Sequence, residues 1–594
     1  MADDIYGVYR TRHEQFAEQL VTTKKKINLI SNLRLAIAVV FIILLYYSFT
    51  QPGLFILLAV LIGLFFHLVK NHASLFAEKS HLENLVLINF QEMNAWKGDL
   101  NELASGSEFI DSHHPYTHDL DMFGDGSFYQ YANRCHTHAG KQRFAATLRK
   151  PLDNALEIER NQDAIKDLAP RIEFRQHFQA SGMEANEQKD DIAQLMAWVA
   201  QPPFLGKSKL LGIALIAIPV LTILALIIAI IYPQLKGILF LLIITQWILT
   251  AVYLKRINVF HDYISRKKNI LQKYSRLLFF IEREDFNAEE LQSISRHAHE
   301  AYKNVEKLAS LVGALDARTN VLAAIFVNSF LMYDLQCVYR LEQWRAKNGS
   351  KLSQWLNAIS EAEVLNSFGT FYYNNPEFCF AQISNELSIR TVQMGHPLLD
   401  RSERVSNDYE IGPSLSVHII TGANMAGKST FLRTLGINMV LALNGAPVCA
   451  RSFQCPVIDI RSGMRTADSL KDHQSYFFAE LNRLKSIMVD LRAERPLLIL
   501  LDEILKGTNS NDKQAGSIAL VKQLLPHPCL AVIATHDLAL GDLEHEYPEK
   551  VKNYSFEATI EDDVLSFDYT LNPGTAKKMN ASYLMRKMGI IPEG

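Results

Sequence analysis

Cysteine pairs, repeats and an excess of one charge are all absent from this chain. The 594 residues include six cysteines, none of them in a C-x-x-C arrangement, which argues against a disulfide framework and favours a reducing compartment. No short repeat and no low-complexity segment is present. The formal net charge is −3, so the bulk charge gives no indication of nucleic-acid binding.

Charged side chains are also missing from long apolar stretches. Residues 35–69 contain no Asp, Glu, Lys or Arg and form two apolar runs split at residues 50–52. Residues 210–254 form two more runs, split at residues 233–236. A membrane-spanning helix needs ~20 apolar residues. The second pair is long enough, and tyrosines at the membrane interface would compensate for the shorter first pair. The sequence predicts two transmembrane hairpins; buried core helices are the alternative.

Lysine and arginine predict the orientation of these four spans. They gather before the first run and after the second, and again before the third and after the fourth, while the two linkers carry a single charge between them. Positive residues favour the cytoplasmic side of a membrane. We therefore expect a multi-pass membrane protein with its linkers outside and all other segments in the cytoplasm. The charged first 30 residues argue against a cleaved signal peptide.

The rest of the chain is long enough for several domains, since one domain usually takes ~100–200 residues. Leu, Glu, Lys, Arg and Gln recur at helical spacing before residue 387, whereas later residues alternate apolar strand runs with helices, as in an α/β domain with a largely parallel sheet. The expected divisions are an N-terminal cytoplasmic helix (1–34), hairpin 1 (35–69), a helical core (71–206), hairpin 2 (210–254), the second part of the core with its levers (257–386) and an α/β domain (387–594).

A phosphate-binding loop stands near the start of the α/β domain. Residues 422–429 match G-x-x-x-x-G-K-[ST], after an apolar strand run and before a helix. In such a loop the backbone N–H groups and the helix N-terminus bind a phosphate. Lys428 would reach the β- and γ-phosphates of ATP, and Ser429 would ligate Mg²⁺. The predicted nucleotide-binding residues are Gly422, Ala423, Asn424, Met425, Ala426, Gly427, Lys428, Ser429 and Thr430.

Two later strand ends carry the remaining candidate catalytic groups. The apolar run 497–501 ends in Asp502 and Glu503, and ligands lie at the carboxyl ends of strands in such sheets. Asp502 suits the Mg²⁺ shell, and Glu503 suits the polarisation of the attacking water. The run 529–535 ends at His536, which would sense or polarise the γ-phosphate. The alternative for His536 is a capping residue on a turn.

These motifs resemble the MutS family of DNA mismatch repair proteins. The resemblance is carried by residues 421–430, 502–510 and 534–537. Weaker similarities occur at 395–400, 405–410, 467–480, 582–592 and in the helical segments 124–131, 148–153 and 159–165. The resemblance implies an ABC-like P-loop ATPase domain, an all-α core, ATP and Mg²⁺ as cofactors and a homodimer. It also implies that Ser475 meets the γ-phosphate bound by the partner subunit.

The sequence departs from the family pattern in ways that affect function. His473, Gln474, Leu505 and Lys506 replace the glycine and arginine residues expected around the nucleotide contacts. Residues 1–118 hold a membrane hairpin in place of a mismatch-recognition domain. We therefore expect a membrane-tethered, dimeric, ATP-driven clamp on mismatched or branched DNA. The alternative is a mechanochemical or regulatory membrane ATPase that does not recognise mismatches, and a transporter ATPase is weaker because no intramembrane charge marks a path.

A histidine- and cysteine-rich stretch offers one further candidate site. Its members are His113, His114, His118, Cys135, His136 and His138. Zinc would need ligands at convergent positions and tighter spacing. Loop residues and the beginning of a buried segment are the favoured interpretation.

Overall fold

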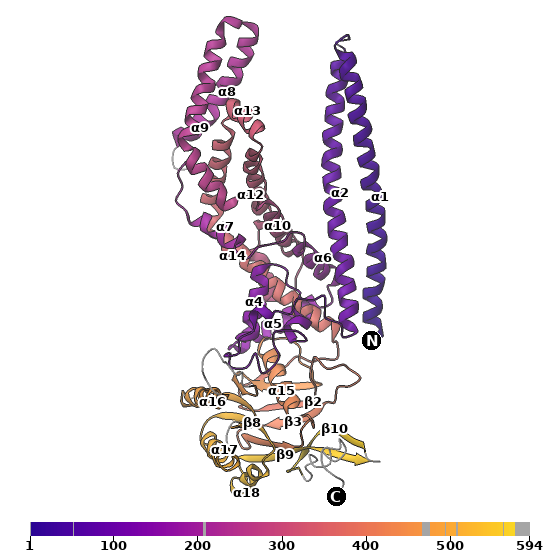
Figure 1. The fold of residues 1–594 in the computed structure, drawn as a ribbon, viewed down its shortest axis with the longest axis vertical. Helices are drawn as coiled ribbons and strands as arrows, with labels where there is room; N and C mark the ends of the chain where they lie inside the picture. Colours follow the sequence, from indigo (N-terminus) through magenta and orange to yellow (C-terminus); the bar gives the residue numbers. More distant parts are fainter. Residues whose placement is uncertain are drawn as a thin grey trace.

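The computed structural model describes residues 2–51, 53–205, 209–465, 476–493, 495–506, 509–561 and 564–576. Two helical arms rise side by side from a body that ends in β-sheets (Figure 1). The mixed α/β portion and the large helical portion confirm the predicted multidomain class.

The first arm is a single long hairpin of two helices. Helix α1 spans Ala2–Ser48 and helix α2 spans Leu54–Trp96. The sequence divisions at residues 34, 69 and 71 all fall inside these helices, because neither helix contains a proline that would end it. Helix α2 ends at Trp96, and Gly98 follows with φ 82°, a conformation that commonly ends helices.

The first arm is fixed to the helical body by buried polar contacts at its base. Glu92 of α2 accepts hydrogen bonds from Arg134, with 3.1 Å between Oε2 and Nη2, and both side chains are almost fully buried. Tyr9 of α1 donates to Asn374 at 2.7 Å. Burial of an unpaired charge is costly, so the Glu92–Arg134 pair requires this arm to be docked at its base.

The helical body is built around one long helix, α14 (Tyr333–Asn374), which packs against α4, α5, α10, α11 and α12. Its shorter helices are α3 (Phe128–Ala132), α4 (His138–Arg149), α5 (Ala155–Leu168), α6 (Ile172–Gly182), α7 (Asp191–Ala200), α10 (Lys268–Arg283), α11 (Glu289–His297) and α12 (Ala301–Asp316). Helix α14 runs from the second arm to the sheets (Figure 1).

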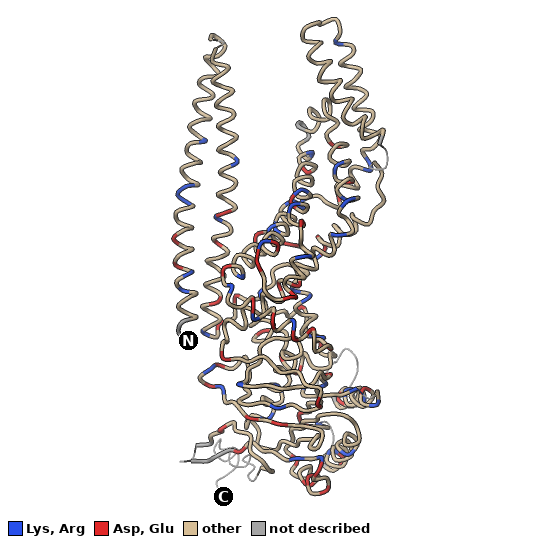
Figure 2. The backbone as a smooth tube through the Cα atoms, turned by 180° about the vertical axis from the view of Figure 1, so that it is seen from behind, with Lys and Arg blue, Asp and Glu red and all other residues tan. Residues whose placement is uncertain are grey.

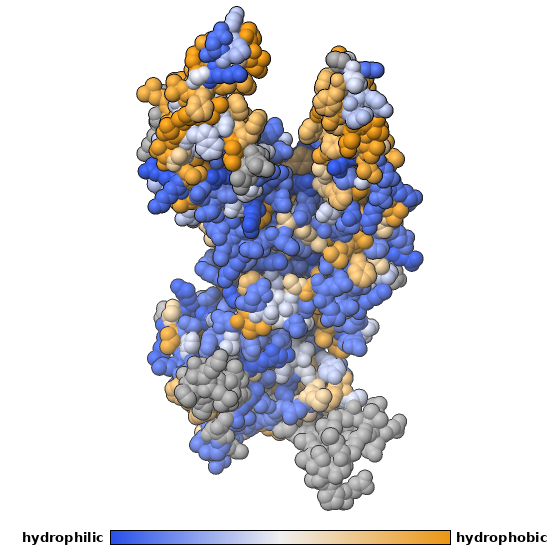
Figure 3. Space-filling model, turned by 45° about the horizontal axis from the view of Figure 1, so that its top comes forward, coloured by the Kyte–Doolittle hydropathy of each residue, from blue (hydrophilic) through white to orange (hydrophobic). Residues whose placement is uncertain are grey.

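The second arm continues from this body into another apolar hairpin. It consists of α8 (Lys209–Ile231), the short turn η2 (Pro233–Leu235) and α9 (Lys236–Ile264), with α13 (Val321–Leu331) beside them. By length and composition α1, α2, α8 and α9 could each cross a membrane. Hydrophobic residues cover the far ends of both arms (Figure 3), and charged residues become sparse there (Figure 2).

The C-terminal body contains two sheets. The larger has the strand order β10-β9-β4-β8-β7-β6, parallel from β9 to β6 with β10 antiparallel at the edge. Its strands are β4 (Val417–Gly422), β6 (Asp459–Gly463), β7 (Leu497–Asp502), β8 (Cys529–Thr535), β9 (Val551–Glu561) and β10 (Val564–Pro573). The smaller sheet, ordered β1-β5-β2-β3, comprises Gln382–Ser384, Ser452–Pro456, Ile389–Met394 and Asn407–Ile411. The C-terminal body also contains the helices α15 (Lys428–Leu443), α16 (Tyr476–Arg492), α17 (Ser510–Leu524) and α18 (Leu543–Glu546).

A loop of the helical body is locked onto the large sheet. Asp119 is 1% exposed and accepts hydrogen bonds from the Ser462 hydroxyl at 2.6 Å and from the backbone N–H of Met464 and of Arg465. The side chain of neighbouring Leu120 lies so close to Gly436 of α15 that a Cβ there would approach it to 2.5 Å. The helical body and the sheet therefore share one packed interface.

Candidate functional site

Three neighbouring parallel strands end at one place. Strand β8 lies between β4 and β7, and Thr421, Thr535 and Asp502 lie near their carboxyl ends. Because parallel strands point their carboxyl ends to one edge, the loop after β4, the carboxylates after β7 and His536 after β8 converge there. The sequence predicted each strand end separately, and the sheet order brings the three together.

The loop after β4 requires glycine at its two ends. Gly422 has φ 153° and Gly427 has φ 107°, in the region that favours glycine. A Cβ at Gly422 would lie 2.6 Å from the backbone oxygen of Phe556, and one at Gly427 would lie 3.1 Å from the Tyr569 ring. Between them Ala423 and Ala426 are buried, whereas Met425 is 80% exposed. The loop therefore turns tightly into the first residue of α15, Lys428.

The Lys428 ammonium is held inside this loop. Its Nζ donates to the backbone oxygens of Gly422 and Ala423, both at 2.8 Å, and lies 3.4 Å from the His536 ring nitrogens. Burial lowers the pKa of Lys428 to about 8, against the opposing attraction of Asp502 and Glu503. A buried cation bound mainly to neutral carbonyls is well suited to receive phosphate oxygens.

Ser429 and Asp502 form the pair expected of a magnesium site. The Ser429 hydroxyl donates to Asp502 Oδ2 at 2.6 Å, although the two residues come from different strand ends. Hydroxyl and carboxylate oxygens are hard ligands, and Mg²⁺ usually takes one or two from the protein and the rest from phosphate and water. The donor set therefore fits Mg²⁺ bound together with a nucleotide.

Glu503 is held by two elements besides its own strand. Its Oε1 lies 2.7 Å from His536 Nε2, and its backbone N–H donates to Ala534 on β8. The hydrogen bond with His536 is the main cause that lowers the pKa of Glu503 to about 2, so the carboxylate stays ionised. Its φ of 55° is unusual for a residue with a side chain. This geometry keeps a charged carboxylate beside the Lys428 loop, as a residue that polarises water requires.

Glu480 is a supporting residue that sequence reasoning did not assign to the site. Its carboxylate, on α16, accepts the backbone N–H of Leu505 at 2.6 Å and that of Lys506 at 3.1 Å. Burial raises the pKa of Glu480. These contacts fix the turn that follows Glu503. The only signal in the sequence was its place within the 467–480 similarity.

A cavity of about 880 Å³ opens over the loop. Residues expected in the site that line it are Asn424, Met425, Gly427, Lys428, Ser429, Thr430, Asp502, Glu503 and His536. His396 and Asn407 line its other walls and belong to the stretches 395–400 and 405–410 that resemble the family's approach to the nucleotide site. Tyr569 also lines it and was not predicted, because it comes from a distant segment that only the fold brings to the loop. Gly422, Ala423 and Ala426 shape the loop from beneath, and Ser475 lies outside the described residues.

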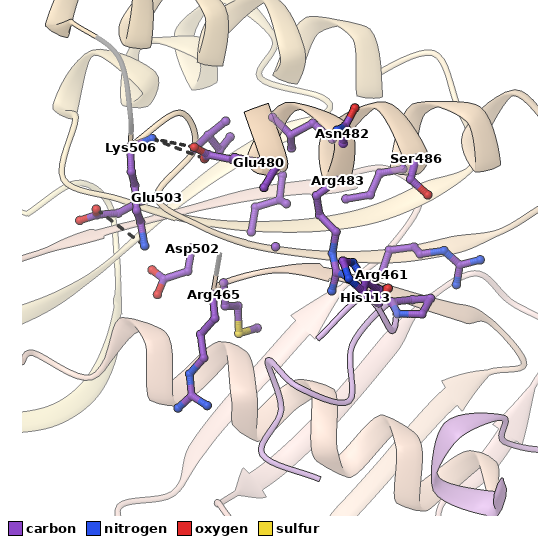
Figure 4. A pocket seen from close by; sticks show the side chains of 18 of the residues that line it. His113, Arg461, Arg465, Glu480, Asn482, Arg483, Ser486, Asp502, Glu503 and Lys506 are labelled. Carbon is purple, nitrogen blue, oxygen red and sulfur yellow. Dashed lines mark hydrogen bonds and ion pairs between the residues drawn. The ribbon is translucent and has the colours of Figure 1, made fainter. Parts of the chain in front are cut away.

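A second cavity of about 430 Å³ adjoins the first at Asp502, Glu503 and Lys506. Figure 4 shows Glu480 and Lys506 toward one end of it and Arg483 and His113 toward the other. Helix α16, which follows the Ser475 segment, forms one of its walls. Helix α16 therefore connects the second cavity, along the chain, to the segment expected to contact a second subunit, which lies outside the described residues.

The histidine- and cysteine-rich stretch has structural roles where it is described. His114 hydrogen-bonds the backbone oxygen of Arg149, and burial lowers its pKa to about 4. His136 is also buried, which lowers its pKa to about 3. Within the described ranges no group of three or more His, Cys, Asp or Glu residues is placed to hold a metal ion.

Comparison with known proteins identifies the family. The family model for MutS domain V matches residues 418–593. DNA mismatch repair protein MutS from Chloroflexus aurantiacus is 32% identical over 213 residues, covering 34% of this chain and 22% of that protein. The Thermotoga neapolitana protein of the same name is 33% identical over 186 residues (31% and 23%), and that of Bacillus subtilis 29% over 238 residues (38% and 27%).

The C-terminal part of the chain, residues 418–593, belongs to the MutS family. The MutS domain V match covers the loop after β4, both carboxylates and His536. Both apolar hairpins lie outside that match. The chain spans only about a quarter of the length of these MutS relatives.

Proposed function

We propose that this MutS-family chain hydrolyses ATP and uses the reaction to move helices that are anchored in a membrane. The proposal of ATP hydrolysis is supported by one observation above all. A single cavity is lined by Lys428, Ser429, Asp502, Glu503 and His536. Each occupies the place that its chemistry requires, although they come from three separate strand ends.

The residues of the chain divide the reaction between them. Lys428 exchanges its two carbonyl partners for phosphate oxygens, while the backbone N–H groups at the start of α15 face the same phosphates. Ser429 and Asp502 hold Mg²⁺, which neutralises charge on the phosphates when bound. Glu503 orients the attacking water, with His536 holding the carboxylate in place. Glu480 keeps the Glu503 turn rigid from α16.

A homodimer would complete the site. The second cavity opens beside Asp502 and Glu503, and its wall α16 continues from the segment that holds Ser475. In the proposed dimer, Ser475 of one subunit approaches the nucleotide bound by the other. Nucleotide binding then closes the dimer, and the locked loop at Asp119 passes that movement to the helical body.

The membrane part of the proposal is supported by the two arms. Four helices are apolar enough to span a membrane, and the hairpins of both arms extend in the same direction, away from the sheets (Figures 1 and 3). Lys and Arg outside the linkers favour a cytoplasmic location for the ATPase and the helical body. Because α14 runs from the second arm to the body, it offers a direct mechanical link.

DNA binding is the second candidate. It is favoured by the relatives, which are named DNA mismatch repair proteins. The MutS domain V match covers the nucleotide domain and leaves out the arms. A mechanochemical membrane ATPase therefore accords better with the geometry than a mismatch clamp does.

The test is ATP hydrolysis by the purified full chain in lipid vesicles, with Lys428→Ala as the inactive control. Hydrolysis is measured alone and with homoduplex, mismatched and branched DNA. We expect Mg²⁺-dependent activity that Lys428→Ala abolishes and that DNA leaves unchanged. Stimulation by mismatched or branched DNA would support the repair clamp instead. Undiminished activity of Lys428→Ala would refute the site. Release of the chain from membranes by alkaline carbonate would refute the four spans.

A further inference from the structure

Helix α13 carries an apolar face that is exposed among the residues that the structure describes. It lies between α12 and α14 in the chain, and the backbone bends by 115° between Glu289–Thr319 and Ala324–Leu331. Ile325 is 47% exposed, Phe326 67% and Leu331 38%. Residues 319–333 contain no Asp, Glu, Lys or Arg. Such an apolar turn would be an unusual end for a helical pair surrounded by water.

Two contacts give the depth of α13 along the second arm. Trp247 of α9 donates its indole N–H to the Ser329 hydroxyl at 3.1 Å. At ~1.5 Å per residue, Trp247 lies ~12 Å along α9 from Lys255, where charged residues begin. Gln336, just after α13, donates to the Leu215 backbone oxygen at 2.9 Å. Leu215 lies ~9 Å along α8 from its first residue.

Both measurements place α13 beside the apolar parts of α8 and α9, ~9–12 Å from their charged cytoplasmic flanks. Its exposed face is continuous with exposed apolar residues at the same level of the hairpin. These are Ile213 and Ile216 on α8 and Ile244, Ile248 and Val252 on α9. Figure 1 shows α13 beside that hairpin. A membrane that surrounds α8 and α9 must therefore also meet α13.

The charges near α13 match a lipid surface. Lys255 and Arg256 are exposed on α9, just beyond its apolar part, and Arg340 is exposed on α14. Because Lys255 lies ~12 Å along α9 from the contact with α13, these cations would face anionic headgroups while the apolar face of α13 lies deeper, in the acyl region. Polar groups on α13 point elsewhere: Asn328 is buried and accepts the backbone N–H of Asp334 at 3.0 Å.

We propose that α13 is an interfacial membrane helix, whose Ile325, Phe326 and Leu331 face inserts into the cytoplasmic leaflet without crossing it. The proposal rests on the membrane location of α8 and α9. Its consequence concerns α14, which begins at Tyr333, just after α13, and reaches the nucleotide body at Asn374. The leaflet thus holds one end of the rod whose other end is next to the ATPase. Changes in lipid composition or in leaflet packing would then shift the position of the second arm.

The test uses the full chain in vesicles of phosphatidylcholine and phosphatidylglycerol. Phe326→Cys and Ile325→Cys are labelled with an environment-sensitive fluorophore, with the parent chain as the background for its own cysteines. Leu224→Cys, exposed on α8, is the control for a span, and Ser310→Cys, exposed on α12, is the control for water. Quenchers are spin labels at shallow or deep positions of the lipid chains, and aqueous iodide.

We expect the labels at 325 and 326 to lose fluorescence mainly to the shallow spin label, the label at 224 to the deep one and the label at 310 to iodide. Quenching of 325 and 326 by iodide alone, with 224 quenched by lipid, would overturn the inference and leave the membrane hairpins intact. Protection of 325 and 326 from all quenchers would also overturn it, because a second protein surface would then cover α13. Failure of lipid to quench 224 would reject the membrane proposal itself.

Discussion

The buried Lys428 ammonium makes nucleotide binding dependent on pH in a range where few other groups titrate. Lys428 is 5% exposed, and burial lowers its pKa to about 8 in the free protein. Bound phosphates stabilise the ammonium and raise its pKa again. Nucleotide binding above pH 8 must therefore take up a proton, and affinity must fall as the pH rises.

The magnitude follows from the titration of one group. With a pKa near 8, about nine-tenths of the free protein carries the proton at pH 7 and about one-tenth at pH 9. Between pH 7 and pH 9 the apparent affinity for the nucleotide should therefore fall about tenfold, which corresponds to ~1.4 kcal/mol of binding free energy. Below pH 7 the effect of Lys428 is absent, because the ammonium is already formed in both states.

Isothermal titration with a non-hydrolysable ATP analogue and Mg²⁺ measures both quantities. Pairs of buffers with different heats of ionisation report the proton uptake. Lys428→Arg keeps its charge at every pH used and should remove the pH dependence, whereas Lys506→Arg, beside the site, should retain it. An affinity of the parent chain that is constant from pH 7 to 9, without proton uptake at pH 8.5, would contradict the reasoning.

Three further substitutions test other parts of the structure. Glu503→Gln should bind ATP normally but hydrolyse it at least ~10²-fold more slowly in single-turnover assays, since it removes the charge that polarises water; retained hydrolysis would exclude Glu503. His536→Asn should raise the pKa of Glu503 from about 2 toward its usual range, so hydrolysis should fall between pH 6 and 4 more steeply than in the parent chain, and parallel profiles would refute this. Asp119→Ala should destabilise the protein by ~3–5 kcal/mol in thermal unfolding, because it leaves buried donors unpaired. The matched change Asp121→Asn, at a half-exposed carboxylate paired with Arg465, should cost only ~0–1 kcal/mol, and equal losses would contradict the role of Asp119.

The nucleotide site illustrates how far local sequence reasoning reaches. Lys428, Asp502 and His536 were predictable because each follows an apolar strand run, and a strand end is a local feature. The hydrogen bond between His536 and Glu503 was not predictable, since it depends on β8 lying next to β7. Glu480 and Tyr569 were missed for the same reason: their places in the site come from the packing of α16 and from strand β10 at the sheet edge.

For the arms, by contrast, the sequence alone predicted the main feature, which is the presence of apolar hairpins. The absence of charge identified the apolar runs without any fold, because length and composition alone determine whether a helix can span a membrane. The divisions drawn around the first hairpin were less successful, since α1 and α2 continue through them as unbroken helices. Helix continuity follows from the lack of a breaker over the whole segment, which a change of composition does not reveal.

The sequence by itself determined the nucleotide-binding motif, the apolar runs and the family resemblance of this protein. Motif residues, apolar run lengths and the distribution of Lys and Arg are properties of short segments, so they can be interpreted before folding. Tertiary structure alone decided which segments meet. It placed Glu503 against His536, locked Asp119 onto the sheet and set α13 at the level of the apolar hairpin, because each of these contacts joins residues far apart in the chain.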